Sequence, residues 1–96
     1  MAKIEKRLKK WLENPPKDAP VDEVAAILNR FFSGHWERKK GSHIIVSHEK
    51  LREYKEFGPF GELTLAVMGG QKVKGIYLKR LALAVSIVQG GEDTDE

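Results

Sequence analysis

The stretch Arg38-Lys39-Lys40-Gly41-Ser42-His43-Ile44-Ile45-Val46 decides the fold, because it reads as a basic strand that turns back into an apolar one. Gly41 tolerates the positive φ that tight hairpin turns require. A two-residue turn at Gly41 and Ser42 would pair Lys40 with His43 across the hairpin. The side chains that we expect to share one face of this hairpin are His43, Arg38, Lys40, Trp36 and Ser47.

Three strands are expected around this hairpin, at about residues 35–40, 43–48 and 62–68. In the last of them Leu63, Leu65 and Val67 alternate with small or polar residues, which is typical of a half-buried antiparallel strand. Residues 49–61 form a charged and aromatic connection that is long for a hairpin loop.

Helices are predicted at about residues 3–13, 21–32 and 73–88 from apolar residues that recur at helical spacing. The predicted fold is therefore α+β, in the order α-α-β-β-β-α, with a three-stranded antiparallel sheet and the helices on one face. The last helix is apolar on more than one side, so either the amino-terminal helix or a second chain must cover it, which leaves a homodimer open. Three segments are expected: an amphipathic helix in 1–16, a domain in 17–90 and an acidic flexible tail in 91–96.

Length and composition narrow the class of protein. The chain has 96 residues, 41% of them hydrophobic, which suits one domain with a modest core. It has no cysteine, which excludes disulfides and thiolate metal sites. No stretch resembles a signal peptide or a membrane span, so we expect a soluble, cytoplasmic protein without a membrane partner.

The charge distribution favours an anionic partner. The net charge is +3, yet four of the 14 acidic residues follow Gly91. From Leu63 to Gly91 there is no acidic residue, whereas Lys72, Lys74 and Lys79 fall in that span. Such segregation points to nucleic acid, although a basic face can also serve solubility alone.

Two separated motifs resemble those of HicA-type toxins of bacterial toxin–antitoxin systems. They are the turn Lys40-Gly41-Ser42-His43 with Arg38 before it, and the run Gly69-Gly70-Gln71-Lys72-Val73-Lys74-Gly75-Ile76-Tyr77-Leu78-Lys79. The resemblance covers about residues 21–88. Two positions depart from it: Ile44 stands where a second histidine is frequent, and Met68 where His or Pro is common.

The resemblance implies a fold similar to the double-stranded-RNA-binding domain and a type II toxin that cleaves mRNA without a metal or other cofactor. It also implies a HicB-type antitoxin as the protein partner, and it places the catalytic role on His43.

Metal-free RNA cleavage needs a base for the 2′-hydroxyl proton, an acid for the leaving 5′-oxygen and positive charge near the phosphate. Histidine serves as either acid or base, because imidazole ordinarily titrates at about pH 6.5. The Gly69-Gly70 turn is expected to lead into the last helix, whose dipole would favour a phosphate. The residues predicted to contact RNA are Trp36, Arg38, Lys39, Lys40, Gly41, Ser42, Gly70, Lys72, Lys74 and Lys79.

The second catalytic group is not evident in the sequence. His48 is five residues from His43 and falls on the opposite face of a regular strand, where a structural pair with His35 is favoured over an acid–base couple with His43. Three classes of function stay open: an RNA endonuclease, a non-catalytic RNA-binding module of the same fold, and a protein-interaction domain.

Overall fold

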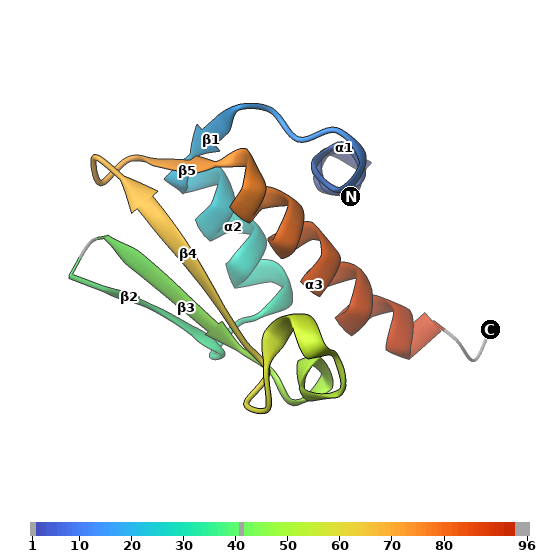
Figure 1. The fold of residues 1–96 in the computed structure, drawn as a ribbon. Coiled ribbons are helices and arrows are strands. Elements are labelled where there is room, and N and C mark those ends of the chain that lie inside the picture. The colour runs from blue at the N-terminus through green and yellow to red at the C-terminus, as the bar shows by residue number, and fades with distance from the viewer. Residues whose placement is uncertain (1, 41, 94–96) are drawn as a thin grey trace.

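A computed structural model describes residues 2–40 and 42–93; the predictions for Gly41 and for residues 94–96 lie outside them. An antiparallel sheet of five strands has the order β1-β5-β4-β3-β2, and α2 and α3 lie on one face of it (Figure 1). The strands are β1 (Asp18–Pro20), β2 (Trp36–Lys39), β3 (His43–Ser47), β4 (Glu62–Met68) and β5 (Lys72–Lys74). The helices are α1 (Ala2–Glu13), α2 (Val21–Phe31) and α3 (Gly75–Asp93), and the short 3-10 helices η1 (Glu49–Glu53) and η2 (Lys55–Phe57) fill the connection between β3 and β4. The predicted α+β class is confirmed, whereas the predicted number of three strands is wrong.

The two additional strands, β1 and β5, pair with each other at one edge of the sheet. Ala19 lies opposite Val73, and both side chains are buried. The Gly75 N–H then donates a hydrogen bond of 2.8 Å to the Lys17 carbonyl oxygen, and a Cβ at Gly75 would collide with the Pro16 carbonyl oxygen. The chain before β1 therefore crosses directly over the start of α3, which begins at Gly75 and not at about residue 73.

The register of the β2–β3 hairpin differs by one residue from the prediction. Lys39, not Lys40, lies opposite His43. The Ser42 N–H donates to the Lys39 carbonyl oxygen at 3.2 Å, so residues 40–42 form a three-residue connection in which Lys40 has a φ of 53°. Because one residue of slip moves every side chain of a strand to the other face, the predicted set of neighbours of His43 changes.

The core lies between the sheet and the helices. One face of the sheet contributes buried side chains from β3, β4 and β5: Ile44, Val46, Leu63, Leu65, Val67 and Val73. The residues between them in sequence are exposed or half-buried, as expected for a sheet with helices on one side only. We call the uncovered side the open face.

Helix α1 packs against α3 and covers one of its apolar sides. Leu8 and Trp11 of α1 are buried in the same cluster as Leu81, Ala84 and Val85 of α3. The amino-terminal helix thus covers a second side of α3 (Figure 1). Ile76, in the first turn of α3, is 63% exposed. No helix in residues 2–40 and 42–93 is long and apolar enough to cross a membrane.

Candidate nucleic-acid interface

A row of side chains crosses the open face at the end of the sheet where the β2–β3 and β4–β5 turns lie. His43 pairs with Lys39 on one side and with Ala66 on the other. The register between β4 and β5, in which Val67 lies opposite Val73, places Lys74 level with Ala66. Because neighbouring strands are about 4.8 Å apart, His43 and Lys74 are separated by about 10 Å at their backbones, with only the small Ala66 between them. We call Lys39, His43, Ala66 and Lys74 the cationic row.

His43 is exposed at the first position of β3. Its Nδ1 lies 3.0 Å from Ser42 Oγ, within hydrogen-bond distance. Ser42 therefore orients the ring while Nε2 points elsewhere. With Nδ1 of His43 held by Ser42, Nε2 is the imidazole nitrogen left to contact a ligand.

Arg38 lies on the other side of the hairpin, contrary to the prediction that it shares a face with His43. It pairs with the fully buried Ile44, and its Nη2 donates a hydrogen bond of 2.8 Å to the Gly70 carbonyl oxygen. This contact joins the two sequence motifs through residues that are 32 positions apart in the chain. Arg38 thereby holds the β2–β3 hairpin beside the β4–β5 turn.

The Gly69-Gly70 turn leads into β5 and not directly into the last helix. Both glycines have positive φ, 57° and 72°, which explains why this turn uses glycine. Lys72 and Lys74 are consequently strand residues, and their alternation puts both on the open face. The expectation that this turn leads into the last helix is wrong, because β5 separates the turn from α3, and the first N–H of α3, that of Gly75, donates to the Lys17 carbonyl oxygen.

Two other residues predicted to contact RNA lie away from the cationic row. Trp36 is half-buried against the core, and its Nε1 donates to Asn29 Oδ1 at 3.3 Å. It is on the helix-covered side with Arg38, so the prediction that it shares a face with His43 is wrong. Lys79 lines an apolar groove of α3 together with Leu12 of α1.

The predicted pair of His35 and His48 is confirmed. The two rings have centroids 5.0 Å apart, and His48 also meets the edge of Phe32 at 6.0 Å. His48 Nδ1 accepts the Lys50 backbone N–H at 3.1 Å and so caps η1. His48 is therefore a structural residue at the far end of β3 from His43.

Ile44 stands where HicA-type toxins frequently have a second histidine, and the structure shows where a side chain at this position lies. Its side chain is fully buried on the helix-covered side of the sheet. A histidine there would face the core and would not reach a ligand on the open face. Among the described residues, no three His, Cys, Asp or Glu side chains are placed to hold a metal ion.

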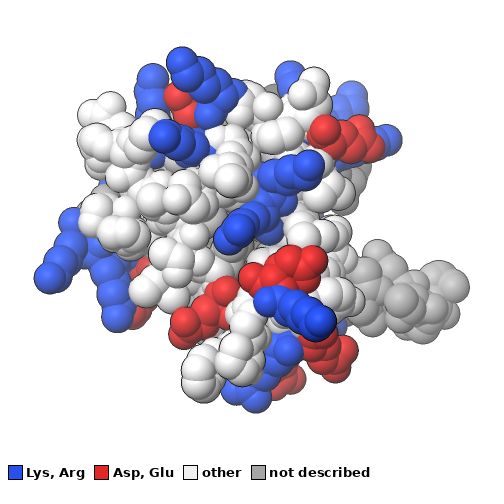
Figure 2. Space-filling view, viewed as in Figure 1, with Lys and Arg blue, Asp and Glu red and all other residues white. Residues whose placement is uncertain are grey.

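The charge on the molecular surface is uneven. Figure 2 shows mainly Lys and Arg at the hairpin tip on the left and at the upper edge of the sheet, while acidic and basic atoms are mixed at the lower edge, over η1 and η2. The acidic side chains of that lower region are Glu49, Glu53 and Glu56. An anionic ligand would thus be attracted to the end of the sheet that bears the cationic row.

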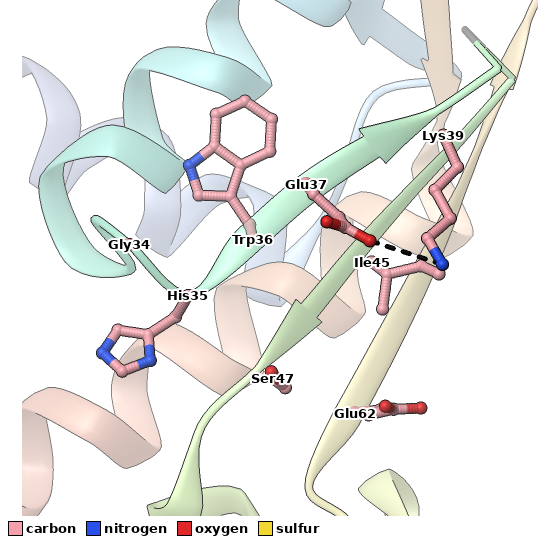
Figure 3. Close-up of a pocket in the computed structure, with 8 residues that line it drawn as sticks. All are labelled: Gly34, His35, Trp36, Glu37, Lys39, Ile45, Ser47 and Glu62. Carbon is pink, nitrogen blue, oxygen red and sulfur yellow. Dashed lines mark ion pairs between the residues drawn. The ribbon is translucent and has the colours of Figure 1, made fainter.

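A depression of about 320 Å³ lies next to the cationic row on the open face (Figure 3). Ile45 and Ser47 of β3 line it, together with the carboxylates of Glu37 and Glu62 from the neighbouring strands. Glu37 also forms an ion pair of 3.3 Å with Lys39. Sequence reasoning missed Glu37, Ile45 and Glu62 as site residues, although alternation along the third predicted strand already put Glu62 on the open side.

No family model, curated protein or solved structure matches this chain.

Proposed function

We propose that this protein is an RNA endonuclease that binds RNA phosphates at the cationic row and uses His43 as a general acid or base. The proposal includes the role of a HicA-type toxin, with mRNA as substrate and a HicB-type antitoxin as the partner that stops cleavage. The observation that carries the proposal is the cationic row itself, because it sets an exposed imidazole between two lysines on one surface.

The chemistry at this row would be transesterification. The RNA 2′-oxygen forms a bond to the adjacent phosphorus, the bond from phosphorus to the 5′-oxygen breaks, and one proton moves from the 2′-hydroxyl while another reaches the 5′-oxygen. His43 would transfer one of these protons through Nε2, since Nδ1 faces Ser42 Oγ. Lys39 and Lys74 would stabilise the charge that develops on the phosphate oxygens.

Replacement of His43 by alanine tests the enzymatic proposal. Induction in bacteria should arrest growth for the wild type only, and purified wild-type protein should cleave RNA in the presence of a chelator. We expect His43→Ala to lower the rate about 10²- to 10⁴-fold, because that is what one acid or base typically contributes. RNA retention on a filter should persist in the variant.

A matched control is Arg52→Ala, an exposed residue of η1 at the far end of the sheet, which should retain full cleavage. Cleavage by His43→Ala at the wild-type rate would refute the catalytic role. If neither protein retained RNA at low salt, both RNA-dependent functions would be excluded and a protein-interaction domain would remain.

One observation favours a non-catalytic RNA-binding module as the second candidate. Among the described residues, the ionisable side chains next to His43 on the open face are Lys39 across the hairpin and Glu37 diagonally. Because these two form an ion pair with each other, neither is an evident second acid or base for cleavage. Equal RNA retention without cleavage by wild type and His43→Ala would support that module.

A further inference from the structure

The depression beside the cationic row has a composition that phosphate binding does not explain. Carboxylates repel a phosphate backbone, yet Glu37 and Glu62 both line this hollow on the same face as His43. The register places Ile45 in the next row below His43, and Ser47 with Glu62 in the row after that. Lys39 of the cationic row also lines the depression and pairs with Glu37, whereas Glu62 lies at the end of the depression farther from His43.

Ile45 gives the depression an apolar surface on which a base could stack. Ile45 is half-buried and offers an apolar surface, and in Figure 3 it lies between the carboxylates of Glu37 and Glu62. Ile45 is two strand residues from His43, about 7 Å along the chain. A base attached to a ribose whose phosphate rests on the cationic row could therefore reach this floor.

Glu62 is the better of the two carboxylates for recognition. Glu37 already pairs with Lys39 at 3.3 Å, whereas Glu62 makes no hydrogen bond or ion pair with another described side chain. A carboxylate accepts two parallel N–H donors in a bidentate arrangement. Guanine presents such a pair, N1–H and N2–H, on the Watson–Crick edge that unpaired RNA exposes.

We propose that this depression binds an unpaired guanine, stacked on Ile45 and held at its Watson–Crick edge by the carboxylate of Glu62. The inference rests on the proposed function, since the cationic row must hold the adjacent phosphate. It makes Glu62 a specificity-determining residue and the substrate a single-stranded RNA with guanine beside the bound phosphate.

The test measures binding of short single-stranded RNAs that differ only in one central nucleotide, G, A, C or U, by fluorescence anisotropy with the full chain. A 2′-deoxyribose at the central nucleotide prevents cleavage there. A bidentate contact typically discriminates between bases by about 5- to 100-fold, so we expect at least about fivefold tighter binding of the G-containing RNA. Glu62→Gln should abolish this preference while binding of the other three RNAs stays equal or tightens.

Glu56→Gln in η2 is the matched control, because it removes the same charge from an exposed site outside the depression and should retain the preference. Equal binding of all four RNAs by the wild type would overturn the guanine site while leaving RNA binding intact. Equal tightening of all four RNAs by Glu62→Gln would also overturn it, since that result reports only relief of repulsion. No binding of any RNA would refute the proposed function together with the guanine site.

Discussion

At the scale of single residues, Lys74 is the cation whose role the fold changes most. The sequence places it near a helix start, but the sheet places it on the open face, level with Ala66 and one strand beyond the partner of His43. A lysine there would neutralise one phosphate of a bound single strand. Each such contact contributes about 0.7 to the slope of log affinity against log salt concentration for single strands.

We therefore expect Lys74→Ala to weaken RNA binding at low salt and to reduce the magnitude of that slope by about 0.7. Lys55→Ala is the control, because Lys55 is exposed in η2 at the other end of the sheet. Filter binding over a series of salt concentrations gives both slopes. Identical slopes for Lys74→Ala and wild type would remove Lys74 from the interface.

At the scale of elements, the sequence predicted those strands and helices whose pattern of buried residues is visible along a single segment. Alternation of Leu63, Leu65 and Val67 predicts β4 with its bounds, since each residue reports its own burial. Strands β1 and β5 have three residues each and are stabilised by pairing between residues 18–20 and 72–74, which no local pattern encodes. Gly75 indicates where α3 begins, because only a glycine at this position allows the chain near Pro16 to cross so closely.

The register of the hairpin is the other feature that local reasoning could not determine. Two- and three-residue connections are both compatible with Lys40-Gly41-Ser42, and the choice moves Arg38 and Trp36 to the opposite face from His43. In the observed register Arg38 donates a hydrogen bond to the Gly70 carbonyl oxygen, a contact between residues distant in the sequence that no local pattern shows. The sequence thus pointed to His43, Lys39 and Lys74, but it could not show which side chains share their face of the sheet.

The contact of Arg38 with Gly70 gives a prediction about the hairpin as an element. Arg38→Gln should lower the free energy of unfolding by at most about 1 kcal/mol, because the hydrogen bond is exposed to solvent. If Arg38 acts by holding the two turns together, the salt dependence of RNA binding should keep its wild-type slope while affinity falls. Urea denaturation and filter binding measure the two effects.

Arg80→Gln removes the same charge from an exposed position of α3 and should change neither quantity by more than experimental error. A decrease of about 0.7 in the salt slope for Arg38→Gln would instead show that Arg38 contacts a phosphate directly.

At the scale of the whole molecule, α1 completes the core by covering α3. Trp11 is only 3% exposed and Leu8 7%, although both belong to a helix whose outer side is basic. Trp11→Ala should lower the free energy of unfolding by about 3 to 5 kcal/mol, which is the usual effect of removing a buried tryptophan. Since domains of this size have a total stability of about 5 to 15 kcal/mol, the variant should unfold at much lower urea concentration.

Lys10→Ala, one residue earlier and exposed, should stay within about 0.5 kcal/mol of the wild type. A loss of less than about 1 kcal/mol for Trp11→Ala would contradict the packing of α1 on α3 in solution. The apolar side of α3 would then need another cover, because a helix that is apolar on more than one side is buried on more than one side. Sedimentation of the wild type distinguishes the two ways of covering α3. A monomer agrees with cover by α1, whereas a dimer agrees with cover by a second chain.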